Sequence, residues 1–329
     1  MDPLVSIIIP IYNVSDYIED CLSSVIAQTY KNLEILCVDD RGTDNSMNIV
    51  RQYAQSDSRI KIIQNKTNIG LGATRNAGIR EALGDYIFFL DSDDYISDNA
   101  IETLVTAAVK SGADIIYGGS EAFPSEQKLI DSRYIQELND KFLKAPALLT
   151  QVSPELCYFA LKSIPCVAWG KLFKASFIHS NQLFFVEQKV LHEDNGFHIK
   201  CLSCQPKIQC LPNRLYLYRI RPESIMSEAR GNVLKRLQHL KLSVDDAINY
   251  IQQSGKNELF VSIVKDTYWD IFSYKTRGIT YYFGKNEKRL KLLGINLIKQ
   301  TSKDGITFSF SFLGIKLFKY SICEKLFEK

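Results

Sequence analysis

Short apolar runs alternate with helix-like spacings through the first 120 residues of the chain. Buried strands are predicted where the runs are short and rich in Ile, Val, Leu and Phe, at 4–9, 33–38, 60–63, 86–90 and 113–117. Between these runs apolar residues recur at steps of three and four, which predicts helices near 17–26, 47–53, 73–83 and 101–109. This order predicts an α/β fold, Rossmann-like, with a mostly parallel sheet covered by helices on both faces.

The pattern changes twice further along the chain. Residues 121–228 are less regular, and from Val233 to Ile251 apolar residues recur at steps of three and four, which predicts an amphipathic helix. We therefore predict a first domain at 1–228, with halves of about 1–120 and 121–228. A smaller, mainly helical region at 229–329 is expected to end in a short β-like tail.

Two similar segments, Gly294–Lys299 and Gly314–Lys319, lie in that tail. One interpretation is a short apolar strand or hairpin that packs on the helical region. The other is a basic and aromatic surface, with Lys316 and Phe318, that rests on an anionic membrane. The sequence leaves both open.

Composition narrows the class of partner. The 329 residues are 46% apolar, enough for a large core, and 40 basic side chains stand against 37 acidic ones, a net charge of +3. A general nucleic-acid binder shows a strong basic excess, so we expect no nucleic-acid partner.

Cysteine usage and hydropathy indicate the compartment. The eight cysteines are thinly spread, and Cys37 lies inside an apolar run, which favours free thiols in a reducing compartment. The first residues show no signal-peptide pattern, and no window approaches the roughly 18–20 apolar residues of a membrane span. We expect a cytoplasmic protein, with a peripheral contact to the inner face of the membrane as the open alternative.

The acidic cluster Asp91-Ser-Asp-Asp94 follows the apolar run 86–90 directly. Residues two apart in extended backbone point the same way, so Asp91 and Asp93 can face one ligand. Such carboxylates repel one another and gain from a shared divalent cation, for which Mg²⁺ or Mn²⁺ suits oxygen ligands. The alternative is a solvated turn before a helix that Asp98 caps. Polar loops at 10–13 and 39–40 follow two other predicted strands, which places all three at one sheet edge.

The chain resembles the inverting glycosyltransferases of family 2, which have the GT-A fold. The segments that carry the resemblance are 5–13, 38–46, 68–78, 89–95, 169–173, 193–194 and 218–224. Their order and spacing extend over about 220 residues, and the tail is similar to those of some bacterial surface-polysaccharide and lipopolysaccharide transferases. The expected function is therefore transfer of a sugar from a UDP-sugar to a hydroxyl of a glycan or lipid-linked oligosaccharide.

The resemblance also implies a donor site. Asp39 is expected to bond the uracil ring, and of Arg219 and Arg221 we expect only Arg221 to reach the diphosphate. The whole set implied for the nucleotide-sugar is Pro10, Tyr12, Asn13, Asp39, Arg75, Asp91, Ser92, Arg221 and Ser224.

The chemistry of single displacement needs two further groups. A carboxylate must take the proton of the acceptor hydroxyl, and the resemblance implies Asp194 with Glu193 beside it. Positive charge must meet the departing diphosphate, and the resemblance implies Mn²⁺ or Mg²⁺ on Asp93, with Asp91 close by. Trp169 and Lys171 are predicted to contact the acceptor.

Structural interpretations stay open for several of these residues. Asp39 is also consistent with a simple turn, Arg75 with an exposed paired helix residue, Glu193–Asp194 with a helix cap, and Trp169 with the core. The alternative functions are a non-catalytic nucleotide-sugar-binding protein and a sugar-phosphate nucleotidylyltransferase. The sequence does not identify the sugar.

Overall fold

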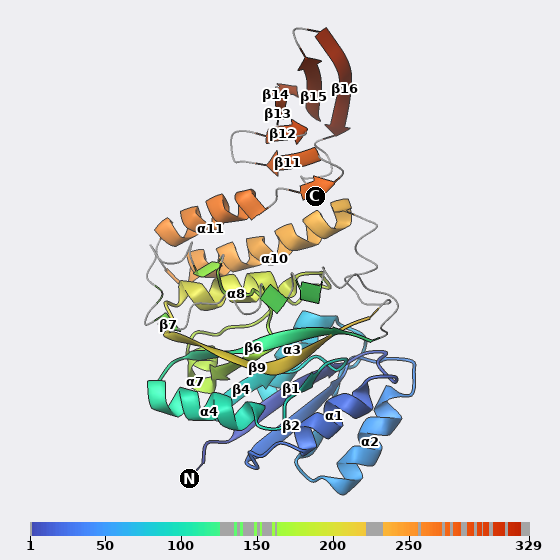
Figure 1. The fold of residues 1–329 in the computed structure, drawn as a ribbon, viewed down its shortest axis with the longest axis vertical. Coiled ribbons are helices and arrows are strands. Elements are labelled where there is room, and N and C mark those ends of the chain that lie inside the picture. Colours follow the sequence, from blue (N-terminus) through green and yellow to red (C-terminus); the bar gives the residue numbers. More distant parts are fainter. Residues whose placement is uncertain are drawn as a thin grey trace. The chain divides into compact units, whose positions relative to one another are not determined.

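The computed structural model divides into two compact units, Met1–Lys256 and Asn257–Lys329 (Figure 1). It describes residues 2–125, 163–221, 233–255 and 258–271, short pieces at 135–136, 139–140, 148–149, 152 and 160–161, and the strands between 274 and 323. At 148–149, at 233, 234 and 237, and beyond residue 265, the description covers the backbone only.

A nine-stranded sheet organises the described part of the first unit, in the order β3-β2-β1-β4-β8-β6-β9-β5, with β7 on β9. Four strands run parallel at one side: β3 (Ile60–Gln64), β2 (Leu33–Asp39), β1 (Val5–Ile11) and β4 (Tyr86–Phe89). The remaining strands are β5 (Tyr95–Ile96), β6 (Ile115–Pro124), β7 (Leu148–Leu149), β8 (Lys171–Lys174) and β9 (Ile208–Ile220).

The strands and helices predicted for the first 120 residues are all present, and the α/β class is confirmed. The helices there are α1 (Ile18–Ile26), α2 (Ser46–Ser56), α3 (Leu71–Glu81) and α4 (Ala100–Ser111). The sheet is mixed rather than parallel throughout, because β8 inserts antiparallel between β4 and β6. That strand comes from the irregular middle region, where the hydrophobic pattern predicted no strand.

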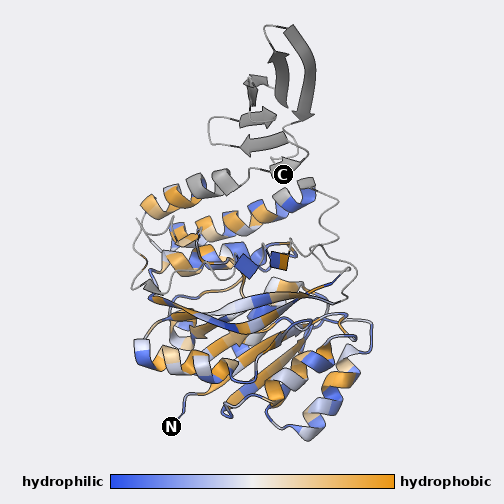
Figure 2. Ribbon diagram, in the orientation of Figure 1, coloured by the Kyte–Doolittle hydropathy of each residue, from blue (hydrophilic) through white to orange (hydrophobic). Residues whose placement is uncertain are grey.

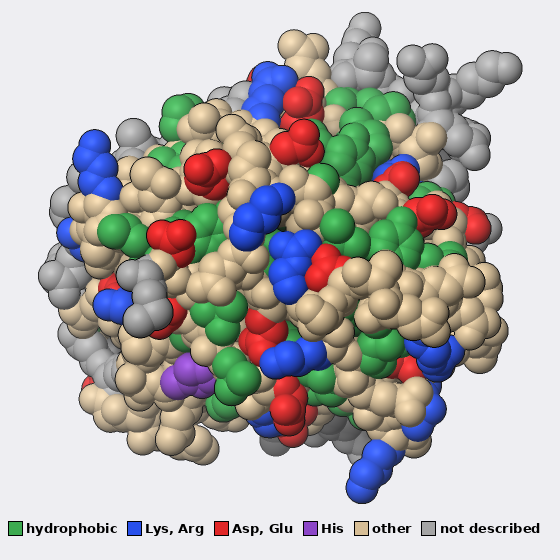
Figure 3. All heavy atoms as spheres, turned by 90° about the horizontal axis from the view of Figure 1, so that it is seen from below, with side chains coloured by type: hydrophobic (Ala, Val, Ile, Leu, Met, Phe, Trp, Pro, Cys, Tyr) green, Lys and Arg blue, Asp and Glu red, His purple; other side chains and the backbone are tan. Residues whose placement is uncertain are grey.

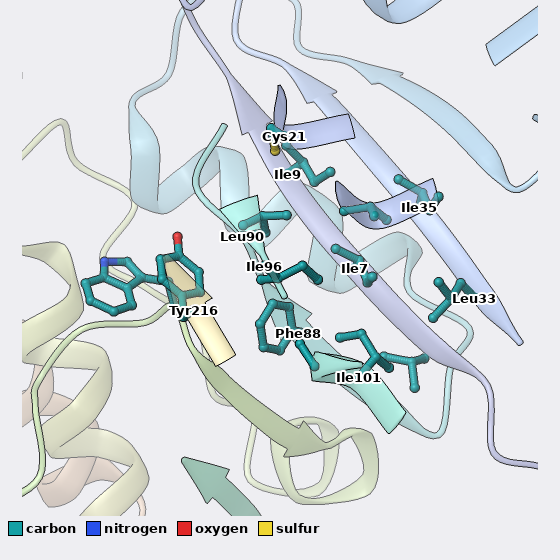
Figure 4. Packing of buried hydrophobic residues seen from close by; sticks show 14 of the residues in the cluster. Ile7, Ile9, Cys21, Leu33, Ile35, Phe88, Leu90, Ile96, Ile101 and Tyr216 are labelled. Atoms are coloured by element: carbon teal, nitrogen blue, oxygen red, sulfur yellow. The ribbon is translucent and has the colours of Figure 1, made fainter. Parts of the chain in front are cut away.

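The two faces of the sheet have separate cores. Ile7, Ile9 and Phe88 belong to one fully buried cluster with residues of α1, α2 and α4 (Figure 4). On the other face, a Cβ at Gly78 of α3 would lie 2.4 Å from Ile8. The Phe89 ring also lies on that face, in edge-to-face contact with the rings of Phe173, Phe185 and Phe197. Alternate side chains of one strand point to opposite faces, and here both faces are apolar, which explains the continuous apolar strands (Figure 2).

Two further helices complete the sheet's second face. They are α7 (Ala175–Ser180) and α8 (Glu193–Ser203), and the amphipathic helix α10 (Val233–Gln253) packs on α8. The contact is close, since a Cβ at Gly196 would lie 2.2 Å from the carbonyl oxygen of Ser243. The Ser243 hydroxyl accepts a bond from the Gly196 N–H at 3.0 Å, which satisfies a free donor in the first turn of α8.

The second unit contains α11 (Glu258–Ile271) and two small antiparallel sheets. Their strands are β10 (Tyr274–Thr276), β11 (Ile279–Phe283), β12 (Lys288–Leu292), β13 (Ile295–Leu297), β14 (Lys299–Ser302), β15 (Gly305–Phe312) and β16 (Ile315–Cys323). The tail therefore has more strands than the short β-like segment that the sequence predicted. The predicted division after residue 228 differs from the division at 256–257 and stays a prediction.

No helix in the described ranges is long and apolar enough to cross a membrane. The face of the molecule in Figure 3 has acidic and basic side chains interspersed.

Candidate active site

Three polar loops meet at the edge formed by the carboxyl ends of β1, β2 and β4, as predicted. The register pairs Ile11 with Asp39, and the Asp40 N–H donates to the Ile11 carbonyl at 2.9 Å. Because β4 is parallel to β1, the loop 91–94 leaves the sheet at the same edge.

The predicted nucleotide end lies in the loops after β1 and β2. Asp39 is buried and accepts bonds from the Arg41 N–H and from the Gln64 side chain, both at 2.8 Å. Asn13 has a positive φ of 51° and accepts a bond from the Thr43 N–H at 2.7 Å. Tyr12 is 48% exposed, which leaves its ring accessible to a base.

Pro10 and Asp40 have mainly structural surroundings. Pro10 is buried within β1. The Asp40 carboxylate accepts bonds from the N–H groups of Ile69 and Gly70 at 2.8 and 3.0 Å, so it fixes the loop that leads into α3.

Arg75 links the acidic loop to the start of α8. Its guanidinium donates to Oδ1 of Asp91 and to Oε1 of Glu193, each at 2.6 Å, and the side chain is 2% exposed. Arg75 is therefore not the exposed helix residue of the structural interpretation. Asp91 and Glu193, 102 positions apart in sequence, share one cation.

Asp194 is the next residue of α8 and is partly buried. Burial and the adjacent Glu193 raise its pKa to about 7, against the opposing charges of Arg75 and Lys171. Its carboxylate accepts a hydrogen bond from the Asn195 side-chain amide at 3.1 Å. A carboxyl group with a pKa near neutrality suits general-base catalysis.

Asp93 pairs with the end of β9. Nε of Arg221 donates to Oδ2 of Asp93 at 2.7 Å, and Nε of Arg219 donates to the Asp93 carbonyl at 2.9 Å. Both arginines thus contact Asp93, Arg219 at its carbonyl and Arg221 at its carboxylate, and the expectation that only Arg221 reaches the diphosphate stays a prediction. Ser92 is buried beside them, and Ser224 lies outside the described residues.

Asp94, to which the sequence assigned no role, joins the acidic loop to β9. It accepts bonds from the Tyr216 hydroxyl and from the Arg219 N–H, each at 2.7 Å. Burial, together with Asp93 and Asp91, raises its pKa well above the usual range. The Tyr216 hydroxyl also accepts a bond from the Asp91 N–H at 3.2 Å. No sequence pattern predicts the contact between Asp94 and Tyr216, which are 122 positions apart.

The predicted acceptor residues lie deeper than expected. Trp169 is 6% exposed and stacks on Tyr216 and Tyr218, with ring centroids 4.4 and 5.3 Å away. Lys171 is buried and donates to the carbonyls of Pro165 and Val167. These contacts favour packing roles, and an acceptor contact stays a prediction for both residues.

The residues present fit a divalent cation only in part. Among the described side chains there is no group of three or more His, Cys, Asp or Glu that could hold a metal ion. Asp91 and Asp93 supply two carboxylates, and each already faces an arginine. Two carboxylates completed by substrate phosphates are a common Mg²⁺ or Mn²⁺ ligand set.

Comparison with known proteins agrees with this geometry. Residues 6–161 match the model of glycosyl transferase family 2, a range that covers β1, the Asp39 loop, Arg75 and the acidic loop. Residues 6–161 are a family 2 glycosyltransferase domain. The predicted resemblance is thereby confirmed.

Curated relatives of the family 2 domain are bacterial glycosyltransferases. The chain is 37% identical over 231 residues to glycosyltransferase GlyA of Streptococcus pneumoniae, covering 68% of this chain and 32% of the relative. It is 31% identical over 292 residues to the poly(ribitol-phosphate) beta-glucosyltransferase of Bacillus spizizenii, covering 87% and 43%. The chain thus spans less than half the length of these two relatives.

Solved structures share the fold of the family 2 domain. Staphylococcus aureus TarS 1–349 in complex with UDP has a TM-score of 0.61 at 21% identity, covering 83% of this chain and 72% of TarS. The mannosyltransferase PcManGT of Pyrobaculum calidifontis, in complex with GDP-Man and Mn²⁺, has a TM-score of 0.55 at 15% identity, covering 84% and 82%. These likenesses confirm the predicted GT-A fold.

Proposed function

We propose that the protein transfers a sugar from a UDP-sugar to a hydroxyl of a glycan or lipid-linked acceptor, in synthesis of a bacterial cell-surface polysaccharide. One observation carries the proposal. The Arg75 guanidinium forms ion pairs, at 2.6 Å each, with Asp91 of the acidic loop 91–94 and with Glu193, the neighbour of Asp194. A donor-binding loop and a candidate base therefore share one site, as direct transfer requires.

The carboxylates support an inverting reaction. In a single displacement, Asp194 takes the proton of the acceptor hydroxyl while that oxygen bonds the anomeric carbon and the diphosphate leaves. Asp194 lies on α8, whereas the nucleotide-side residue Asp39 ends β2 and Asn13 follows β1. Arg221, directly after β9 and beside the acidic loop, can donate to the diphosphate oxygens as negative charge develops on them.

Metal dependence is part of the proposal. Asp93, with Asp91, would hold Mn²⁺ or Mg²⁺, and a bound cation would neutralise the diphosphate as it departs. A relative in fold, PcManGT, was solved with Mn²⁺.

The choice of nucleotide and the place of action rest on weaker similarities. TarS was solved with UDP, and PcManGT with GDP-Man, so both nucleotides belong in the test. The Arg41 N–H holds the Asp39 carboxylate at the polar edge of the sheet. In this proposal the nucleotide base lies at the same edge. We propose action in the cytoplasm at a lipid-linked acceptor, with the membrane contact of residues 305–329 tested by liposome binding of a chain that lacks them.

Calorimetric titration with UDP and with GDP, each with Mn²⁺ and with EDTA, tests the donor site. Binding of UDP that requires both Mn²⁺ and Asp93, lost in Asp93→Ala, supports the proposal and justifies transfer assays with UDP-sugars. The matched control is Asp57→Ala, which removes a carboxylate paired with Arg59 after α2. Absence of nucleotide binding under every condition contradicts a donor site here and favours a non-catalytic protein.

A further inference from the structure

The Arg75 guanidinium faces carboxylates rather than open solvent, which is unusual for a residue expected to bind the donor, and its buried Nε has no hydrogen-bond partner among the described residues. Both terminal nitrogens are bonded to carboxylates at 2.6 Å, and 2% of the side chain is exposed. The Phe185 ring centroid lies 5.3 Å from the guanidinium carbon. Little of Arg75 is left to offer to a nucleotide or a sugar.

Helix α3 holds the segment that leads into α8. The Asn76 amide donates to the Phe185 carbonyl at 2.9 Å and accepts from the Phe185 N–H at 2.8 Å. A Cβ at Gly72 would lie 2.9 Å from the Val186 carbonyl and 3.2 Å from Cβ of Glu193. One face of α3 is thus fitted to the backbone before α8 and to the first residue of α8.

We propose that Arg75 and Glu193 are a positioning pair for Asp194. The ion pair between Glu193 and Arg75 attaches the start of α8 to α3, and the ion pair between Arg75 and Asp91 attaches α3 to the acidic loop. Together they fix the position of Asp194 relative to that loop. The inference rests on the proposed function, in which Asp194 is the general base. It gives Glu193 a role other than proton transfer and Arg75 a role other than donor binding.

Charge adds a second consequence to the geometry. The charged groups that act on Asp194 are Glu193 and Asp91, which disfavour its ionised form, and Arg75 and Lys171, which favour it. Removing the Arg75 charge therefore raises the pH at which Asp194 ionises, and removing the Glu193 charge lowers it. The two substitutions are therefore expected to shift the pKa of Asp194 in opposite directions, because they remove opposite charges.

Turnover and donor binding are measured separately in Arg75→Gln, Arg75→Lys and Glu193→Gln. The substrate is whichever of UDP-GlcNAc, UDP-glucose and UDP-galactose the wild type hydrolyses fastest with Mn²⁺. A misplaced base costs on the order of 100-fold in rate, so kcat is expected to fall by about that factor while the UDP dissociation constant stays at its wild-type value. Arg75→Lys keeps the charge but cannot bridge two carboxylates, so its pH profile stays near wild type while its kcat falls.

A direct titration gives a readout that needs neither donor nor metal. In protein labelled with ¹³C at aspartate carboxyls, the Asp194 signal is identified by its loss in Asp194→Asn. Its midpoint is expected to rise in Arg75→Gln and to fall in Glu193→Gln. Should Arg75→Gln fail to fold, Glu193→Gln carries the test alone, because it keeps the pair of Arg75 with Asp91.

Arg80→Gln is the matched control. Arg80 lies on the same helix and pairs at 2.5 Å with Glu187 of the same segment, but 51% of its side chain is exposed. It is expected to leave kcat and the Asp194 midpoint unchanged.

The outcomes separate this inference from the proposed function. If Asp194→Asn keeps wild-type turnover, Asp194 is not the base and the proposed mechanism fails with the pair. If Asp194→Asn loses turnover but Arg75→Gln weakens UDP binding and keeps kcat, Arg75 is a donor ligand and only the positioning role is overturned. Midpoints that move in the same direction in both variants overturn it as well.

Discussion

Nε of Arg221 lies 2.7 Å from Oδ2 of Asp93, so an ion pair connects the residue after β9 to the acidic loop. The Arg221 side chain is 15% exposed and the Asp93 side chain 21%. The same carboxylate is the candidate metal ligand. If Asp93 holds a divalent cation as proposed, the guanidinium and the cation would compete for this carboxylate, and Arg221 would then be free to donate to the diphosphate.

Arg221→Gln is expected to change two affinities in opposite directions. Mn²⁺ alone binds more tightly because the competing cation is gone, which electron paramagnetic resonance of free Mn²⁺ detects. UDP in the presence of Mn²⁺ binds about 10-fold more weakly, the value of one charge-assisted hydrogen bond. Arg214→Gln, within β9 and paired with Glu121 at 3.0 Å on the surface, should change neither affinity. Unchanged Mn²⁺ binding in Arg221→Gln would contradict the competition.

Turnover is expected to depend on pH through Asp194. A base must be ionised to act, and the pKa of Asp194 is raised to about 7 by burial and by Glu193, so kcat falls as pH drops below about 7. Asp194→Asn should reduce kcat by about 10²- to 10⁴-fold and leave UDP binding intact. A pH-independent kcat between pH 5 and 8 is the result that speaks against this assignment.

The same carboxyl group makes stability depend on pH. The folded state favours the protonated form, because the pKa of Asp194 rises from 3.8 to about 7 on folding. Its stabilising contribution is complete below the unfolded pKa and is lost as pH rises through about 7. The midpoint of thermal unfolding of Asp194→Asn, relative to wild type, should therefore increase from pH 4 to pH 8. A difference that is constant over this range would exclude the shift.

Tyr216→Phe is expected to weaken the connection between β9 and the acidic loop. The hydroxyl donates to Asp94 and accepts from the Asp91 N–H, so its removal leaves the buried Asp94 carboxylate and the partly buried Asp91 N–H without that partner. The expected loss in the free energy of unfolding is about 2–6 kcal/mol, from about 1–3 kcal/mol for each unsatisfied group. Urea denaturation measures it. Tyr53→Phe, which removes an exposed bond of 2.9 Å to Ser23, is the control and should be close to neutral.

Gly196→Ala should destabilise the protein although alanine favours helices. Its Cβ would lie 2.2 Å from the Ser243 carbonyl oxygen, so α8 and α10 must move apart. Overpacking costs about 1–3 kcal/mol, more than the roughly 0.5–1 kcal/mol gained from helix propensity. Because Asp194 lies two residues away, kcat should fall as well. A higher denaturation midpoint in Gly196→Ala would show that the helices adjust freely.

Local pattern was sufficient for the first half of the fold. The buried strands that lead to Asn13, Asp39 and Asp91 and the helices between them follow from hydrophobic periodicity, because both faces of the sheet are covered and most strand residues are apolar. The polar loops at one sheet edge follow from the parallel order. Asp194 was found by resemblance alone, because a helix that begins with two acids is also an ordinary N-terminal turn.

What the sequence by itself determined is the α/β class, the edge of the sheet that carries the polar loops, and the family to which those loops belong. Only the tertiary structure decided that β8 inserts antiparallel, that Arg75 bridges Asp91 and Glu193, and that Asp94 bonds Tyr216. The reason is physical. Periodicity reports which face of an element is buried, whereas an ion pair or a strand neighbour depends on which segments meet, and that is set by the packing of segments that can lie far apart in the sequence.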